Sequence, residues 1–154
     1  MLSQKARYAL RALVELARTG PDGQLTSGEI AERADAPRKF LEAILLEMAR
    51  RSIVISRRGK FGGYALARPA DQIRFAEVIR VIDGPLALAP CASRTAFRKC
   101  HDCPSLETCA IRGALLKARD ATSDILEAYS LADALVSTTP LDAPPLGENY
   151  PAEI

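Results

Sequence analysis

The most restrictive feature of the sequence is a basic, glycine-rich turn between two short runs of strand-forming residues. The stretch "SIVISRRGKFGGYALARP" begins with β-branched residues at 53–56, turns through three glycines and continues as "YALA". Runs separated by a glycine-containing loop are typical of a β-hairpin. Arg57, Arg58 and Lys60 lie at its tip, so the hairpin would present concentrated positive charge.

Two amphipathic helices are predicted immediately before this hairpin. Thr26 or Ser27 can cap the first helix, and Glu29 lies in its first turn. Pro37 suits the first turn of the second helix, where its missing N–H leaves no hydrogen bond unmade. Apolar residues then recur every three or four positions, at Phe40, Leu41, Ile44, Leu45 and Met48. Two helices joined by a short turn are typical of a helix-turn-helix motif.

Further helices are predicted over 3–18, 75–83 and 105–129, with Ser105 as the cap of the last. The expected fold class is mainly α with a small β-hairpin: a winged helix-turn-helix domain plus a long C-terminal dimerisation helix. Its four parts would be the winged domain with a linker helix, a cysteine-rich sensor loop, the long helix with a terminal short helix, and a disordered Pro-rich tail, over 1–84, 85–104, 105–136 and 137–154.

The long C-terminal helix predicts a homodimer. Ala110, Ala114, Ala118 and Ile125 form one apolar stripe along it. This helix follows its own domain by a loop, so the same helix of a second copy is the simplest cover for the stripe. The alternative is that the helix folds back on its own domain.

Charge is distributed unevenly along the 154 residues. Residues 1–68 contain 13 Lys and Arg against 7 Asp and Glu, whereas residues 69–154 contain 8 against 12. A basic first half indicates contact with a polyanion. No stretch approaches the ~18 consecutive apolar residues of a membrane span, and charges interrupt the first helix, unlike a signal peptide. We therefore expect a cytoplasmic protein that does not bind membranes.

The predicted partner is double-stranded DNA. The second helix of the motif can enter a major groove about 12 Å wide, with Arg38 and Lys39 at its leading end. Glu42 can accept a hydrogen bond from cytosine, or can be an ordinary surface residue. The hairpin can lie on phosphates or enter the minor groove. The full predicted DNA-binding set is Ser27, Arg38, Lys39, Glu42, Arg57, Arg58, Lys60, Gly62, Gly63 and Tyr64.

All four cysteines lie within 19 residues, at Cys91, Cys100, Cys103 and Cys109, in a polar loop that also contains the only histidine, His101. Burial in a core does not explain such density. A reducing cytoplasm disfavours structural disulfides. Four thiolates suit zinc, although only one pair has C-x2-C spacing, and they also suit an iron–sulfur cluster. An enzyme is not expected, because the chain has one His, no Gly-rich phosphate loop and no Ser/His/Asp set.

Several segments in order resemble the IscR/NsrR/RirA family of winged-helix, iron–sulfur-type transcription regulators. They are "RYALRALVELA", "EIAERADAPRKFLEAILLEMARRSIV", "RRGKFGGYALAR", "AEVIRVIDG" and the downstream cysteine group. The resemblance covers roughly residues 1–136. It implies a homodimer that binds a partly palindromic operator, with Arg58 in the minor groove and the long helix crossing to the partner subunit.

The resemblance also implies a cluster, 2Fe–2S or 4Fe–4S, held by Cys91, Cys103 and Cys109. Family members complete the ligand set with a His three residues after the last cysteine or with an acidic residue of helix one. Here those positions are Arg112 and Tyr8. Cys100 then becomes the expected fourth ligand or a spare thiol, and His101 an exposed loop residue or a ligand.

The expected function is a homodimeric, sequence-specific regulator whose operator affinity is switched by this cluster, in response to redox state, nitric oxide or iron. The alternatives are a cluster-free regulator of the same fold that senses through thiols or a partner protein, and a zinc-stabilised DNA-binding protein.

Overall fold

The computed structural model describes residues 2–59, 62–103 and 105–136. They form α1 (Gln4–Arg18), α2 (Ser27–Arg33), α3 (Arg38–Arg50), β1 (Val54–Arg57), β2 (Gly63–Leu66), α4 (Phe75–Ile82), α5 (Arg112–Ala128) and α6 (Leu131–Val136), with 3-10 turns η1 (Ala70–Gln72) and η2 (Pro90–Ala92). The predicted class, mainly α with a small β-hairpin, is confirmed. Lys60 and the predicted tail over 137–154 lie outside the described residues.

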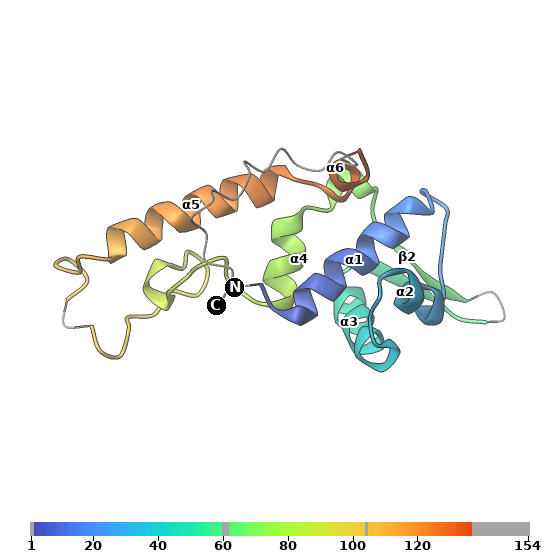
Figure 1. Cartoon of the computed structure of the whole chain (residues 1–154), viewed down its shortest axis with the longest axis horizontal. Coiled ribbons are helices and arrows are strands. Elements are labelled where there is room, and N and C mark those ends of the chain that lie inside the picture. Colours follow the sequence, from blue (N-terminus) through green and yellow to red (C-terminus); the bar gives the residue numbers. More distant parts are fainter. Residues whose placement is uncertain (1, 60–61, 104, 137–154) are drawn as a thin grey trace, which may run out of the picture.

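The hydrophobic core lies between α1, α2, α3, α4 and α6 (Figure 1). The expected inner face of α3 is buried at Leu41, Ile44, Leu45 and Met48, whereas Phe40 is 43% exposed at the edge. In α1 the alanines 6, 9 and 12 are fully buried, as are Leu13 and Leu16. Small side chains at these positions let α1 lie close to its neighbours, so α1 is the central helix of the domain.

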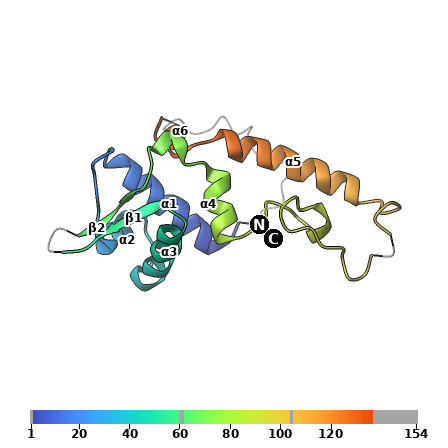
Figure 2. The same cartoon turned by 180° about the vertical axis from the view of Figure 1, so that it is seen from behind.

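The hairpin is an antiparallel pair in which Val54 faces Leu66 and Arg57 faces Gly63, so the wing is formed as predicted (Figure 2). Its return strand is tied to the start of the helix-turn-helix, because Leu25 and Tyr64 exchange backbone hydrogen bonds of 3.0 and 2.7 Å. A Cβ at Gly63 would lie 2.7 Å from the carbonyl oxygen of Leu25. Glycine is therefore required there to let the strand approach this closely.

The long helix begins later than the sequence predicts. Ser105 does not cap it; the Ser105 hydroxyl accepts hydrogen bonds from the backbone N–H groups of Glu107 and Thr108, which closes a local turn. α5 starts at Arg112, preceded by Ile111 as an N-cap without a side-chain hydrogen bond. Apolar spacing over 106–111 suggested a helix, but these residues instead form the far side of the cysteine loop.

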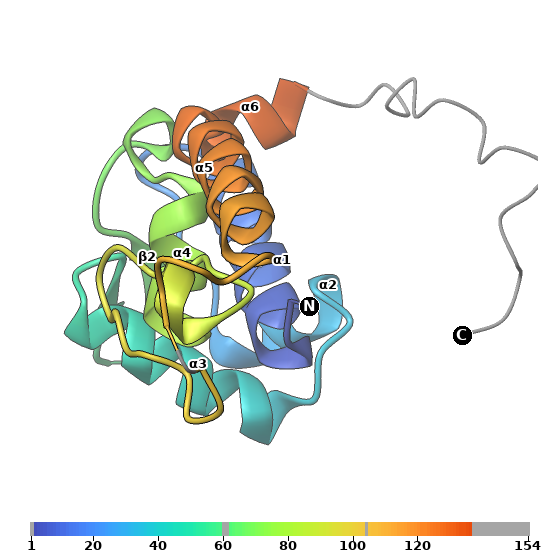
Figure 3. The same cartoon turned by 90° about the vertical axis from the view of Figure 1, so that its left-hand side faces the viewer.

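α5 extends away from the helical core, and the loop between α4 and α5 runs beside it (Figures 1 and 3). Its C-terminal end is anchored next to α4: Phe75 N–H donates to the Tyr129 carbonyl at 3.0 Å, and their rings pack edge to face at 5.1 Å. The next residues return to the core through a 3.0 Å hydrogen bond from Leu131 N–H to Ile73 O. α5 is therefore attached to the helical core at its C-terminal end, close to the DNA-binding half.

Candidate DNA-binding surface and cysteine site

α2 is held by a capping box, in which Thr26 and Glu29 bond reciprocally to each other's backbone N–H. This cap places Ser27 at the start of α2, where its hydroxyl donates to Glu42 Oε1 at 3.1 Å. Arg38 Nε donates to the same oxygen at 3.1 Å. These two contacts connect the start of α2 with the first turns of α3.

The hydrogen bond from Arg38, and then that from Ser27, lower the pKa of Glu42. Lys39 also lies close enough to contribute by its charge, and both cations are exposed. Four of the predicted DNA-binding residues therefore form one exposed polar cluster. A carboxylate held by two donors on the same face is positioned to meet a groove edge as a fixed acceptor.

The wing places Arg57 and Arg58 in exposed positions beyond the core. Arg57 Nη1 lies 3.5 Å from Gln24 Oε1, so it leans toward the start of the helix-turn-helix. Gly62 and Gly63 serve the turn and the close strand approach, and Tyr64 packs partly against the core. Among the described residues of this hairpin, the two arginines are exposed to an external polyanion, whereas the glycines and Tyr64 shape the element that carries them.

All four cysteines line a single cavity of about 220 Å³ at the N-terminal end of α5. Cys91, on η2, is buried, and the other three are half-buried. The neighbouring thiol of Cys100, and then burial, raise the pKa of Cys91, and the Arg112 charge opposes the shift. Cys103 donates to the Ser105 carbonyl at 3.2 Å. His101 is exposed and is not among the lining residues.

The donor chemistry of this cavity fits an iron–sulfur cluster or zinc, because both accept a set of four thiolates. Among the described residues, however, no three His, Cys, Asp or Glu side chains are grouped closely enough to hold a metal ion together. The cavity therefore brings the predicted ligands together without a preformed coordination geometry.

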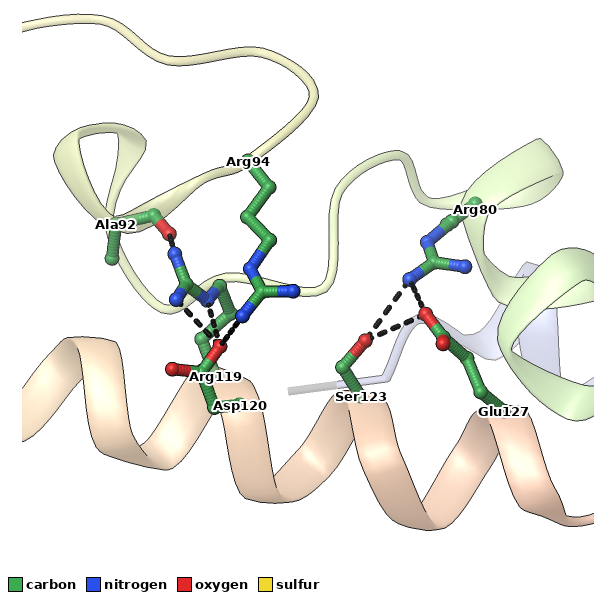
Figure 4. Close-up of polar contacts among 7 residues, drawn as sticks. All are labelled: Arg80, Ala92, Arg94, Arg119, Asp120, Ser123 and Glu127. Carbon is green, nitrogen blue, oxygen red and sulfur yellow. Dashed lines mark hydrogen bonds and ion pairs between the residues drawn. The ribbon is translucent and has the colours of Figure 1, made fainter.

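Polar contacts along α5 were missed in the sequence reading. Figure 4 shows Arg119 and Asp120 meeting the cysteine loop at Ala92 and Arg94, and Arg80 of α4 reaching Ser123 and Glu127. The signal available in the sequence was the i, i+3, i+7 spacing of Asp120, Ser123 and Glu127 on a helix otherwise described by its apolar stripe.

Comparison with known proteins identifies the chain. Residues 2–137 match the family described as "Rrf2: Iron-dependent Transcriptional regulator". The chain belongs to the Rrf2 family. An rrf2-like HTH-type transcriptional regulator of Rhodobacter capsulatus is 39% identical over 144 residues, which cover 91% of this chain and 95% of that protein.

Solved Rrf2-like folds agree with the architecture. CymR, the global cysteine regulator of B. subtilis, superposes with a TM-score of 0.73 at 27% identity, over 90% of this chain and 98% of that one. T. potens IscR superposes with a TM-score of 0.69 at 24% identity, over 90% and 88%, which supports the fold alone. This Rrf2-family chain is thus a DNA-binding winged-helix transcriptional regulator. None of its described helices has the length and apolar character needed to cross a bilayer.

Proposed function

We propose that this protein is a homodimeric operator-binding regulator whose DNA affinity is switched by an iron–sulfur cluster held in its cysteine loop. The observation that carries the proposal is the single cavity lined by all four thiols at the N-terminal end of α5. Residues far apart in the loop have no packing reason to gather there, since three of the four are only half-buried. We expect it to act in the cytoplasm.

Cys91, Cys103 and Cys109 would hold the cluster, with Cys100 as the fourth ligand. Cys100 is the best candidate for that place because it lines the same cavity as Cys91, whereas His101 is not among the residues that line it. When bound, the cluster would supply a centre sensitive to oxidants, nitric oxide or iron supply. Engagement of the four thiolates would draw 91–109 into one rigid unit against α5.

The polar cluster of the helix-turn-helix and the wing support the DNA-binding part of this proposal. The cluster of Ser27, Arg38, Lys39 and Glu42 would enter the major groove, and the wing arginines, Arg58 above all, would contact the minor groove or its phosphates. A dimer presents two such surfaces, which must match half-sites about one helical turn apart. A shift of the long helix would change that separation and hence the affinity.

The exposed surface of α5 supports the dimer. Ser123 is its one buried residue, and Ile125 and the preceding Ile111 are each 67% exposed. Leu88 in the neighbouring loop is 71% exposed. Isolated exposed apolar residues are ordinary, but several on one protruding helix and the loop beside it favour burial against a second copy.

Protein purified without oxygen tests the cluster. We expect visible absorption with iron and acid-labile sulfide in stoichiometric amounts, and little zinc. Cys109→Ser should lose both iron and sulfide, whereas the matched variant Ser93→Ala, which leaves the four thiols in place, should keep them. A colourless, iron-free wild-type protein that still binds DNA under strict anaerobiosis would overturn the cluster.

The second candidate is a thiol sensor of the same fold, favoured by the presence of Cys91 and Cys100 in one cavity. CymR, a structural neighbour, is described as a cysteine regulator. The same preparation distinguishes the two candidates: an iron-free protein whose DNA binding changes reversibly with peroxide and dithiothreitol would support thiol sensing. Zinc at one equivalent with no response to either reagent would instead indicate a structural metal.

A further inference from the structure

We propose that two groups of polar contacts on one face of α5 connect the Cys91 turn to α4, and that Arg119 is the positioning residue through which the state of the cysteine loop reaches the DNA-binding domain. The inference rests on the proposed function, since it supplies the connection that such a switch requires. We call the contacts of Arg94, Arg119, Asp120 and Ala92 the loop clasp, and those of Arg80, Ser123 and Glu127 the α4 clasp (Figure 4).

The loop clasp holds the turn that carries Cys91. Arg119 Nη1 donates to the carbonyl of Ala92 at 2.7 Å, while its Nε and Nη2 donate to Asp120 Oδ1 at 2.9 and 2.5 Å. Arg94, two residues further along the loop, donates to the same oxygen at 2.8 Å. Both the main chain next to Cys91 and the side chain of Arg94 are therefore fixed to one point on α5.

Burial makes this contact specific. The Arg119 side chain is only 12% exposed, and Ala92 is fully buried. A guanidinium that is withdrawn from water needs its donors paired, and its planar fork here satisfies a carbonyl and a carboxylate together. Lysine could not make both contacts with the same geometry. Arg119 thus has one stable arrangement, which requires the Cys91 turn to stay where it is.

The α4 clasp lies one turn further along the same face. Arg80 Nη2 donates to Ser123 Oγ at 3.0 Å and forms an ion pair with Glu127, whose Oε1 also accepts from Ser123 at 2.8 Å. Residues 120, 123 and 127 follow helical i, i+3, i+7 spacing, so both clasps lie on a single stripe. α5 therefore behaves as a rigid bar between them.

From α4 the connection continues through apolar packing. α4 contacts both α1 and α3, and Ala76 and Val78 of α4 are fully buried. α3 carries Arg38 and Glu42 on its exposed side. Because a close-packed interior transmits displacement, a change in the position of α4 has to be accommodated by α3.

Cluster assembly requires movement in the cysteine loop. The described cysteines are not grouped at metal-binding distances, so part of the loop has to move when four thiolates share one centre. A shift of the Cys91 turn would either carry α5 with it through the loop clasp or break the clasp. In the first case α5 changes its arrangement relative to α4, and in the second it keeps only the α4 clasp, so the two states of the loop differ in how α5 is held, which is the bistable element that coupling needs.

The test compares wild type with Arg119→Met, which removes the donors and keeps an apolar stem. Operator fragments are selected from a random duplex library with wild-type protein, and affinity is measured for cluster-loaded and cluster-free forms. In wild type the two affinities should differ by tenfold or more. In Arg119→Met the ratio should fall to within about twofold of one, with cluster content unchanged. Glu15→Gln, which removes the Arg18–Glu15 pair on α1, should keep the wild-type ratio.

A wild-type ratio retained by Arg119→Met would overturn the inference and leave the proposed function intact. No difference between the two forms of wild type would overturn cluster switching, and hydrogen exchange then decides the connection by itself. In cluster-free Arg119→Met, amides of 75–82 should exchange faster than in wild type, and unchanged protection there would refute the connection. If Arg119→Met does not fold, Asp120→Asn and Arg94→Gln provide the same comparison with smaller changes.

Discussion

The DNA-binding half and the sensor half are stabilised by different interactions. Residues 2–82 contain nearly the whole hydrophobic core, including the fully buried side chains of α1, α3 and α4. Between 85 and 128, by contrast, the buried residues among those described are Cys91, Ala92, Ser93 and Ser123. The first half is therefore held by apolar burial and the second by ion pairs, hydrogen bonds and contacts at one end of α5.

This difference indicates where regulation can act. A densely packed core has one arrangement and resists displacement, which suits a rigid reader of DNA geometry. A loop and helix held by a few polar contacts can change arrangement at small energetic cost. The sensor half thus has the looser construction that a switch requires, and the remaining stabilisation would come from the partner subunit and the cluster.

The largest expected effect contrasts two isoleucines. Ile44→Ala in α3 should lower the free energy of unfolding by about 2–5 kcal/mol, because Ile44 is fully buried and its removal leaves a cavity. The loss should not depend on protein concentration. Ile125→Ala, at a position 67% exposed in one chain, should shift the thermal midpoint only in a concentration-dependent way, because it acts through the dimer. Urea and thermal unfolding at several protein concentrations measure both. If Ile125→Ala lowered the free energy of unfolding by several kcal/mol at every protein concentration, the contrast between the packed core and the exposed surface of α5 would be wrong.

The next effect concerns charge in the two halves. Arg58→Ala in the wing should weaken operator binding about tenfold and reduce the slope of log affinity against log salt by about one, because one phosphate-neutralising contact is lost. Lys117→Ala removes the same charge from an exposed position on α5 and should leave the salt slope unchanged. Fluorescence anisotropy between about 50 and 200 mM salt compares the two. If both variants lost the same amount of operator affinity, net charge rather than the wing would govern DNA binding.

A smaller effect separates the two helix starts. Thr26→Ala removes the capping box of α2 and should cost about 1 kcal/mol of stability. Ile111 precedes α5 without making a side-chain cap, so Ile111→Ala should change stability by less than about 0.5 kcal/mol. Chemical denaturation, in which both variants are fitted with the same dependence of unfolding free energy on denaturant concentration, measures both changes in stability. A cost at Ile111 equal to that at Thr26 would show that the α5 start is stabilised by contacts outside the single chain.

Local sequence patterns predicted the DNA-binding half well. The cap at Thr26, the apolar spacing of α3 and the glycine-rich turn each act over a few residues, so their consequences are visible in the sequence. The same patterns predicted the wing and placed Arg38 and Glu42 on the second helix of the helix-turn-helix motif. It did not show that Glu42 is held by Ser27, because that contact spans two helices.

The sensor half was less predictable because its contacts are long-range. Apolar spacing extended the long helix back to Ser105, but the Ser105 hydroxyl closes a local turn and α5 begins only at Arg112. Proximity of the four thiols could be expected from their spacing, whereas their geometry could not. The pairing of Arg119 with Ala92 joins residues 27 positions apart, and no periodic pattern encodes such a contact.

The smallest effect is a pH dependence confined to the α4 clasp. The hydrogen bond from Arg80, and then that from Ser123, hold the pKa of Glu127 below its usual value of 4.5. A depressed pKa in the folded state means that Glu127 contributes stability at neutral pH, and that this contribution is lost as the pH falls below 4.5 through the folded-state pKa. The thermal midpoint of wild type should therefore exceed that of Glu127→Gln at neutral pH, and the difference should shrink as the pH falls below 4.5. In an Arg80→Gln background the same Glu127→Gln change should have a smaller effect, because the largest cause of the lowered pKa is gone and only the hydrogen bond from Ser123 remains. If the difference between wild type and Glu127→Gln did not shrink as the pH falls below 4.5, Glu127 would stabilise α5 through packing rather than through its charge, and the contact between α4 and α5 would not be ionic in origin.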